Sequence, residues 1–149
     1  MSKNILLAVD TAAHDPAQHV VAAAEMTREL ARDSGDHVIV LHVHEFAVGR
    51  FGRIRIDCAD GEGEEVVEKI VSDLRAAGVS AEGEISEANT GHVAKVILAA
   101  AKHRDVRLVV LGSSSRTDLP CTLLGSVASR LLHTSTRPVL IVPRPDTAS

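Results

Sequence analysis

The hydrophobic and polar positions divide the chain into short apolar runs separated by longer segments with a helical period. Four largely apolar runs are too short for ordinary helices: Ile5–Val9, Val38–Val43, Leu108–Leu111 and Pro138–Pro143. A fifth segment, Val79–Ile85, alternates between apolar and polar side chains, which is typical of a strand with one exposed face. The pattern therefore predicts five strands.

The segments between these strands carry apolar side chains three and four positions apart, which predicts amphipathic helices. Asp15-Pro16 combines an N-cap with a proline in the first turn, and Gly78 suits a C-cap. The four expected helices run from Asp15 to Gly35, from about Glu64 to Ala77, from near Thr90, and from near Leu123–Gly125.

Strands and helices that alternate in this way form a parallel sheet with helices on both faces. We therefore expect a three-layer, doubly wound α/β fold with a five-stranded parallel sheet. The first and fourth strands are short and wholly apolar and belong in the centre, whereas the alternating third strand belongs at an edge. These positions give the strand order 3-2-1-4-5. Residues 1–144 would form a single domain, and 145–149 a polar tail.

Ligands of open α/β sheets bind at the carboxyl ends of the strands beside the point where the strand order reverses. In the expected order, that point lies between Val9-Asp10 and Leu111-Gly112. The last strand, Pro138–Pro143, would form an apolar edge, and exposed apolar edges pair with other strands. We therefore expect a homodimer through this edge.

The long connection from Glu45 to Gly63 is interpreted as a surface loop. It contains Arg50, Arg53 and Arg55 together with both phenylalanines of the chain. The arginines could reach a triphosphate or remain solvated charges. The phenylalanines are expected to pack down as a small cover or a dimer contact.

The composition narrows the class of partner. The chain has 149 residues, a net charge of −4 and no tyrosine or tryptophan. Nucleic-acid-binding surfaces are normally basic and often stack bases on aromatic rings, so nucleic acid is not an expected partner. The two cysteines form no C-x-x-C pair, and neither a signal peptide nor a membrane-length apolar run is evident. We expect a cytoplasmic protein that does not contact membranes.

The candidate chemistry follows the fourth strand. Gly112 ends the run Leu108–Leu111 and precedes three serines, and Gly125-Ser126 stands where the fourth helix is expected to begin. Backbone N–H groups in a loop and at a helix N-terminus bind anions such as phosphates. The same glycines could instead form only a strand-to-helix turn.

These segments resemble the universal stress protein (UspA-like) family over essentially the whole chain. The nucleotide-binding branch of that family carries the motif G-x2-G-x9-G-(S/T), which reads Gly112-x2-Ser115-x9-Gly125-Ser126 here. The resemblance implies an adenine nucleotide alpha hydrolase-like fold and a dimeric ATP-binding module of the cellular stress response. The other matching segments are Ile5–Asp10, Leu41–Val43, Gly91, Gly112–Ser114, Leu124–Val127 and Arg137–Pro143.

By this resemblance, adenine would lie against Ala8, Val9 and Val43, and Asp10 would lie beside the ribose hydroxyls. The resemblance implies six further cofactor-site residues at and after the end of the fourth strand: Leu111, Gly112, Ser115, Gly125, Ser126 and Val127. Those from Gly112 onward would wrap the phosphates.

Ser115 stands where the family motif has its second glycine. If this position requires a positive φ, serine costs about 1 kcal/mol of strain. The alternative function is therefore a family member that binds no nucleotide and acts through dimerisation and protein contacts.

The motifs of an efficient hydrolase are missing. No Walker lysine follows Gly112, and no G-x-S-x-G elbow occurs. We therefore expect no enzymatic activity beyond slow ATP hydrolysis. His42 and His44 would face the same side of a strand, but no cysteine or carboxylate stands at convincing ligand spacing, so no protein metal site is expected. Mg²⁺ would arrive only with ATP.

Overall fold

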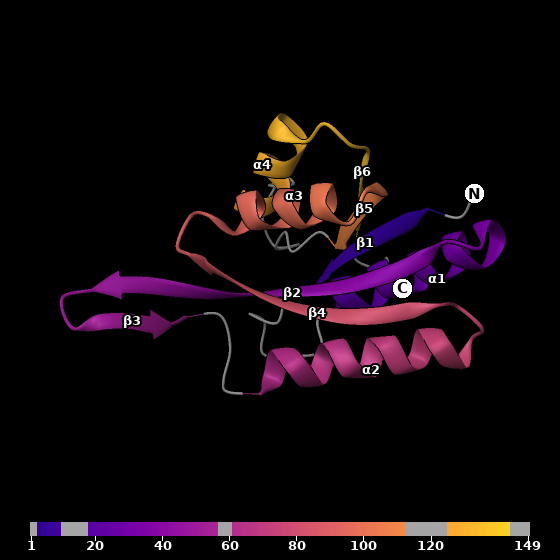
Figure 1. Cartoon of the computed structure of the whole chain (residues 1–149), viewed down its shortest axis with the longest axis horizontal. Helices are drawn as coiled ribbons and strands as arrows, with labels where there is room; N and C mark the ends of the chain where they lie inside the picture. The colour runs from indigo at the N-terminus through magenta and orange to yellow at the C-terminus, as the bar shows by residue number, and fades with distance from the viewer. Residues whose placement is uncertain (1–2, 10–17, 57–60, 113–124, 144–149) are drawn as a thin grey trace, which may run out of the picture.

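The structure, a computed structural model, describes residues 3–9, 18–56, 61–112 and 125–143 (Figure 1). Within these residues, all five expected strands and all four expected helices are confirmed, and one further strand is present. In chain order the elements are β1 (Asn4–Val9), α1 (Gln18–Ser34), β2 (His37–Gly49), β3 (Gly52–Arg55), α2 (Glu62–Ala76), β4 (Ala81–Asn89), α3 (Val93–His103), β5 (Val106–Gly112), α4 (Ser126–Thr134) and β6 (Val139–Val142).

The five expected strands form a parallel array in the order β4-β2-β1-β5-β6. This order is the predicted 3-2-1-4-5. The labels differ because the sequence did not predict β3, which raises the number of each later strand by one. β1 lies at the centre, where Leu7 pairs with Val40 on one side and with Val110 on the other. The strand order reverses between β1 and β5, so their carboxyl ends mark the expected binding edge.

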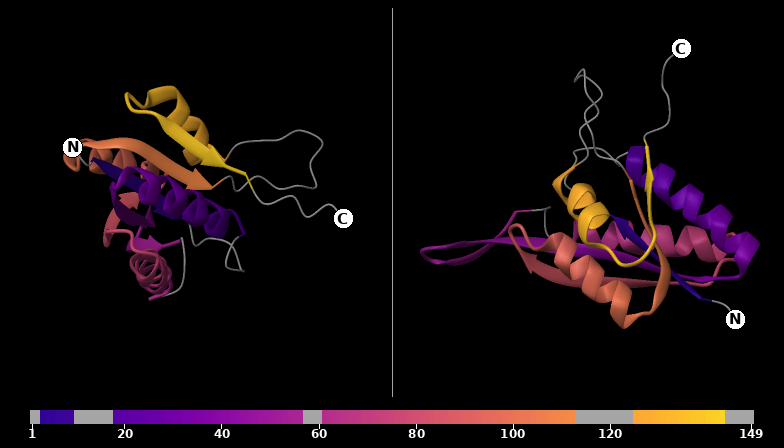
Figure 2. Two further views of the ribbon diagram at one scale, coloured as in Figure 1. Left: turned by 90° about the vertical axis from the view of Figure 1, so that its right-hand side faces the viewer. Right: turned by 90° about the horizontal axis from the view of Figure 1, so that it is seen from above.

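Two helices cover each face of the sheet, which confirms the three-layer arrangement (Figures 1 and 2). Leu7 and Val110 point into the core beneath α1 and α2, whereas Leu6 and Val109 point toward α3 and α4. All four of these side chains are fully buried. Alternate residues of the central strands therefore serve opposite cores, which explains why these strands are apolar throughout.

β4 is the half-exposed edge that its alternation predicts. It pairs with β2 alone among the described strands. On one face, a Cβ at Gly83 would meet Val67 of α2, so this helix packs close to the strand. On the other face, Arg104 donates from Nη1 to Glu82 at 2.6 Å and from Nη2 to Glu84 at 2.8 Å. Glu82 and Glu84 of β4 are therefore held by Arg104, the C-cap residue of α3.

The interpretation of Glu45–Gly63 as a loop was wrong where the structure describes it, and residues 57–60 lie outside the described residues. β2 continues to Gly49, the chain turns, and β3 returns antiparallel to it, with Val48 opposite Arg53. Gly52 adopts a φ of 117°, a conformation that glycine adopts readily. The backbone N–H of Ile56 donates to the carbonyl of Glu45 at 2.9 Å, which extends the pairing by one residue. A β-hairpin therefore stands at the carboxyl end of the sheet.

Candidate functional site

A cavity of about 320 Å³ opens where β1 and β5 end. The carboxyl ends of β1 and β5 and the middle of β2 form its floor, and the beginnings of α1, α3 and α4 form its walls. The lining residues are Ala8, Val9, His19, Val20, Leu41, His42, Val43, Glu45, Ile56, Val93, Ile97, Leu111, Gly112, Gly125, Ser126, Val127 and Ala128.

The structure brings together residues that the sequence analysis singled out separately. Eight of the ten expected site residues are described, and all eight line this one cavity: Ala8, Val9, Val43, Leu111, Gly112, Gly125, Ser126 and Val127. The other two, Asp10 and Ser115, lie outside the described residues.

The floor of the cavity is aliphatic and rigid. Val9, Val43 and Leu111 are each more than nine-tenths buried. Val93 and Ile97, one turn apart on α3, add a wall that the sequence analysis did not identify. The spacing of Val93 and Ile97 predicts only that they face the core. Their position beside the cavity depends on how α3 packs against the sheet. A flat aromatic or heteroaromatic ring can lie against such a surface through dispersion and apolar burial.

The N-terminus of α4 supplies the polar side of the cavity. Gly125 is its N-cap, and no side chain among the described residues caps the helix. The first helical hydrogen bond runs from the N–H of Ser129 to the carbonyl of Gly125 at 2.9 Å. The N–H groups of Ser126, Val127 and Ala128 therefore have no partner within the helix, and all three residues line the cavity. Such an end attracts anions through these N–H groups and the helix dipole.

Gly112 is required by a close contact between β5 and α1. A Cβ at this position would collide with the backbone carbonyl oxygen and carbon of His19, in the first turn of α1. The family resemblance implies that Gly112 wraps the phosphates. The described contact is instead with the protein backbone, and it holds the start of α1 against the cavity.

His42 and His44 are buried side by side where β2 meets α2. Their rings are 4.9 Å apart and nearly perpendicular. His42 donates from Nδ1 to the carbonyl of Val9 at 3.0 Å, and His44 donates from Nε2 to Glu64 at 2.8 Å. The hydrogen bond from His44 holds the pKa of the Glu64 carboxyl below its ordinary value. Gly63 makes room for both rings, because a Cβ there would overlap them.

These contacts give the two histidines a role in packing β2 against β1 and α2. Within the described ranges, no three His, Cys, Asp or Glu side chains are grouped so that they could hold a metal ion. Nor does any helix of the described segments have the length and apolar character needed to cross a membrane.

The arginines expected in the loop lie along the hairpin instead. Arg53 and Arg55 share one face of β3, and neither lines the cavity. The guanidinium of Arg53 lies 4.0 Å from the centre of the Phe46 ring and pairs with Glu87 at 3.1 Å. Phe51 does not pack down as a cover, because 99% of its surface is exposed.

The sequence matches the model of the universal stress protein family over residues 1–143. A universal stress protein of Mycolicibacterium smegmatis is 29% identical over 150 aligned positions, which cover 97% of this chain and 49% of that protein. One from Methanocaldococcus jannaschii is 34% identical over 84 residues, or 56% of this chain and 48% of that protein. The chain thus spans about half the length of each relative.

Solved structures of universal stress proteins share the fold. One from Archaeoglobus fulgidus has a TM-score of 0.73 at 22% identity and covers 95% of this chain and 99% of its own. An Archaeoglobus fulgidus universal stress protein in complex with dAMP has a TM-score of 0.67 at 22% identity, covering 94% and 97%. A universal stress protein in complex with cAMP has a TM-score of 0.68 at 16% identity, covering 96% and 98%.

Proposed function

Because the chain belongs to the universal stress protein family, we propose that its cavity binds an adenine nucleotide, with ATP as the ligand, and that the protein acts as a dimeric sensor or binding protein in the cellular stress response. One observation carries the proposal: an aliphatic slot and the N-terminus of α4, which no described side chain caps, open into the same cavity. A nucleotide needs both features, the first for its base and the second for its phosphates. The complexes of structural neighbours with dAMP and cAMP support this choice of ligand class.

The ligand would lie across the tips of the central strands. Its base would occupy the slot between Ala8, Val9 and Val43, and Asp10 would lie beside the ribose. Its phosphates would follow the backbone from Gly112 toward Ser115 and the N-terminus of α4, including Ser126 and Val127. The described cavity lining contains no lysine or arginine. Backbone N–H groups and a Mg²⁺ ion carried by ATP would therefore balance the phosphate charge.

We infer a binding protein rather than an efficient enzyme. Rapid hydrolysis needs a positioned base for water and cations that stabilise the transferring phosphoryl group. The described lining provides one carboxylate, that of Glu45, and it stands on β2, whereas the phosphate end of the proposed site lies at α4. Slow hydrolysis during long occupancy is the most that this arrangement supports.

Thermal unfolding and calorimetric titration with ATP, AMP and GTP test the proposal. ATP at one hundred times its Kd should stabilise the fold by about 2.7 kcal/mol, which raises the Tm by roughly 5–10 °C. GTP should bind at least about tenfold more weakly, since adenine and guanine present different edges to the slot. If millimolar ATP and Mg²⁺ produce neither heat nor a Tm shift, the alternative holds: a family member that acts through dimerisation and protein contacts alone.

The dimer is proposed from the edge strand β6. Among the described strands, β6 pairs with β5 alone, and its half-buried side chains Val139, Leu140 and Ile141 lie beside the other edge, on the two faces of the sheet. Pairing with a second copy around a two-fold axis would cover them. Sedimentation at micromolar concentration should give twice the chain mass, and Leu140→Lys should shift the protein toward monomer. A wild-type monomer would contradict this arrangement.

A further inference from the structure

A serine, a histidine and a glutamate lie together at the start of β2 and β4, outside the proposed nucleotide site. His37 is the first residue of β2, and Ser80 directly precedes β4. The Oγ of Ser80 lies 2.6 Å from Nδ1 of His37, and Nε2 of His37 lies 3.4 Å from Oε1 of Glu82. A hydroxyl, an imidazole and a carboxylate in this order form the arrangement that activates serine nucleophiles.

The register of the sheet places the three side chains on one face. Val38 of β2 pairs with Ala81 of β4, and both belong to the core beneath α1 and α2. Their neighbours point to the other face of the sheet, because side chains alternate along a strand. His37 precedes Val38 by one position, and Ser80 and Glu82 flank Ala81. The cluster therefore results from parallel pairing at the start of two adjacent strands.

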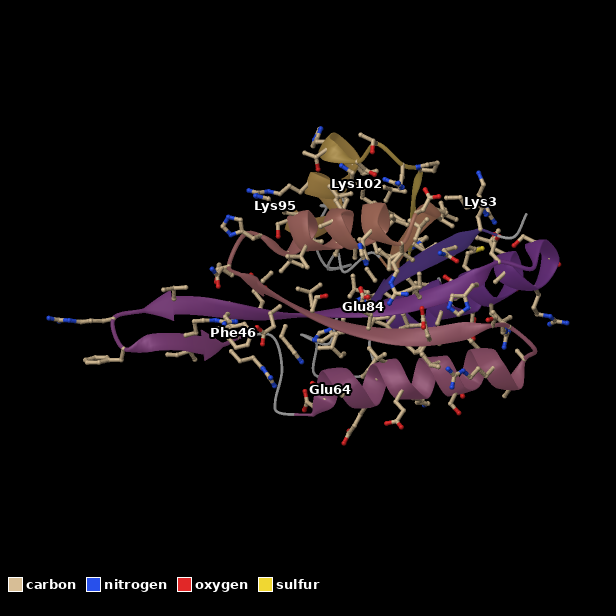
Figure 3. All side chains as sticks on the ribbon, in the orientation of Figure 1. Lys3, Phe46, Glu64, Glu84, Lys95 and Lys102 are labelled. Carbon is tan, nitrogen blue, oxygen red and sulfur yellow. The ribbon has the colours of Figure 1, made fainter. Side chains whose placement is uncertain are left out.

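Backbone hydrogen bonds hold His37 and Ser80 in position. The N–H of His37 donates to the carbonyl of Lys3 at 3.1 Å, and the N–H of Val38 donates to the carbonyl of Ser80 at 2.9 Å. Figure 3 shows Lys3 at the end of the sheet away from Phe46 and the hairpin. The cluster thus lies at the amino ends of the strands, whereas the proposed nucleotide cavity opens where β1 and β5 end.

The protonation of the cluster follows from Glu82. Partial burial opposes ionisation of its carboxyl, but the hydrogen bond from His37 and the charge of Arg104 hold the pKa of this carboxyl below its ordinary value. An ionised carboxylate can only accept hydrogen bonds, so Nε2 of His37 carries the ring proton. Nδ1 of the neutral ring then accepts the hydrogen bond from the hydroxyl of Ser80. The lone pair on Nδ1 can therefore take the hydroxyl proton when Oγ attacks.

The cluster is open to reagents from solution. Ser80 is exposed, and the side chains of His37 and Glu82 keep 32% and 41% of their surface exposed. Arg104 holds the carboxylate of Glu82 from another side, with Nη1 2.6 Å from Oε1. The serine thus combines free access with a base whose orientation is fixed. General-base assistance of this kind accelerates a reaction by roughly 10²–10⁴-fold, which supports a single slow acylation rather than rapid turnover.

We propose that Ser80 is a modification site that takes an acyl group from small activated esters, with His37 as its general base. Oγ of Ser80 attacks the carbonyl carbon of the ester while Nδ1 of His37 takes the hydroxyl proton. The bond between that carbon and the leaving-group oxygen then breaks, and the proton passes from His37 to this oxygen. The products are a serine ester and a free alcohol or phenol. Glu82 is a positioning residue, because it orients the imidazole without touching the reacting atoms.

Acetylation by p-nitrophenyl acetate tests the proposal, followed through the release of nitrophenolate and by peptide mapping with mass spectrometry. We expect Ser80 to acquire the acetyl group at least about 100-fold faster than Ser72, an exposed serine of α2. Ser80→Ala should abolish this fast phase, and His37→Gln should slow it by about 100-fold. The matched control, Ser72→Ala, should react as the wild type does. Phenylmethylsulfonyl fluoride, which forms a stable adduct with activated serines, should label Ser80 as well.

Glu82→Gln tests the positioning role separately. A glutamine can bond to either tautomer of His37, so acetylation of Ser80 should slow by about tenfold. ¹⁵N NMR of the imidazole should show mainly the Nε2–H tautomer in the wild type and a mixture in the variant. Circular dichroism checks that each variant is folded. Equal acetylation of Ser80 and Ser72, or an unchanged rate in folded His37→Gln, would overturn the proposal, because the three side chains would then only join the starts of β2 and β4.

Discussion

Replacing Ser126 with aspartate is expected to lower the affinity for ATP by about 30-fold, or about 2 kcal/mol. Ser126 is exposed in the first turn of α4 and lines the cavity. A carboxylate at this position would interact with the same N–H groups that we assign to the phosphates. It would also repel the phosphates over a few ångströms, and each such charge pair costs several kcal/mol before screening.

The matched control is Ser126→Asn, which has nearly the same shape and no charge. Its affinity for ATP should fall by only a few fold. Neither change should unfold the protein, and the aspartate should raise the Tm of the ligand-free form slightly, because acidic residues stabilise helix N-termini. Calorimetric titration and thermal unfolding measure both effects. Equal ATP affinities for the two variants would show that the phosphates do not approach α4.

Gly112→Ala is expected to destabilise the fold by about 2–3 kcal/mol, which lowers the Tm by roughly 4–12 °C. The added methyl group would collide with the backbone of His19, and a backbone cannot rotate away as a flexible side chain can. The start of α1 must therefore move away from β5, which also reshapes one wall of the cavity.

Gly49→Ala provides the comparison for this glycine. The nearest atom to a Cβ at Gly49 is the carbonyl oxygen of Gly52 at 3.7 Å, an ordinary contact. Its substitution should change the stability by less than about 0.5 kcal/mol. Urea unfolding of the two variants measures the difference. If Gly112→Ala is as stable as the wild type, the close packing of α1 against β5 is not maintained in solution.

The sequence predicts the parallel sheet well because its signal is strong at each strand. Alternate residues of β1 and β5 face two different cores, so their runs are wholly apolar and their central place follows. The position of the cavity follows from the strand order, which is why Val9 and Leu111 could be assigned to one site from distant segments.

The hairpin could not be predicted in the same way. Its turn has Arg50 and Phe51 between two glycines rather than the Asn-Gly pair that signals a tight hairpin. Its apolar residues are exposed, so no burial pattern marks them. Val48 and Ile54 are residue types that favour strands, but two such residues do not by themselves predict a strand.

Other features depend on tertiary contacts that leave no local signal. The spacing of His42 and His44 placed both rings on one face, but their partners Val9 and Glu64 come from elsewhere in the chain. The contact that requires Gly112 is with His19, more than ninety positions earlier in the chain. A glycine after a strand predicts that another group lies close to its backbone, but it does not identify that group.

The central claim is that adenine nucleotide phosphates bind at the N-terminus of α4 while the base lies against the strand tips. Backbone amide NMR signals of the ¹⁵N-labelled protein, followed during titration with ATP and Mg²⁺, test it most directly. We predict saturable shifts of the Ser126, Val127 and Ala128 amides, together with that of Val43, and unchanged signals from the far end of α2. Unchanged α4 signals at about 5 mM ATP, a concentration that would nearly saturate even a site of submillimolar Kd, would contradict the claim.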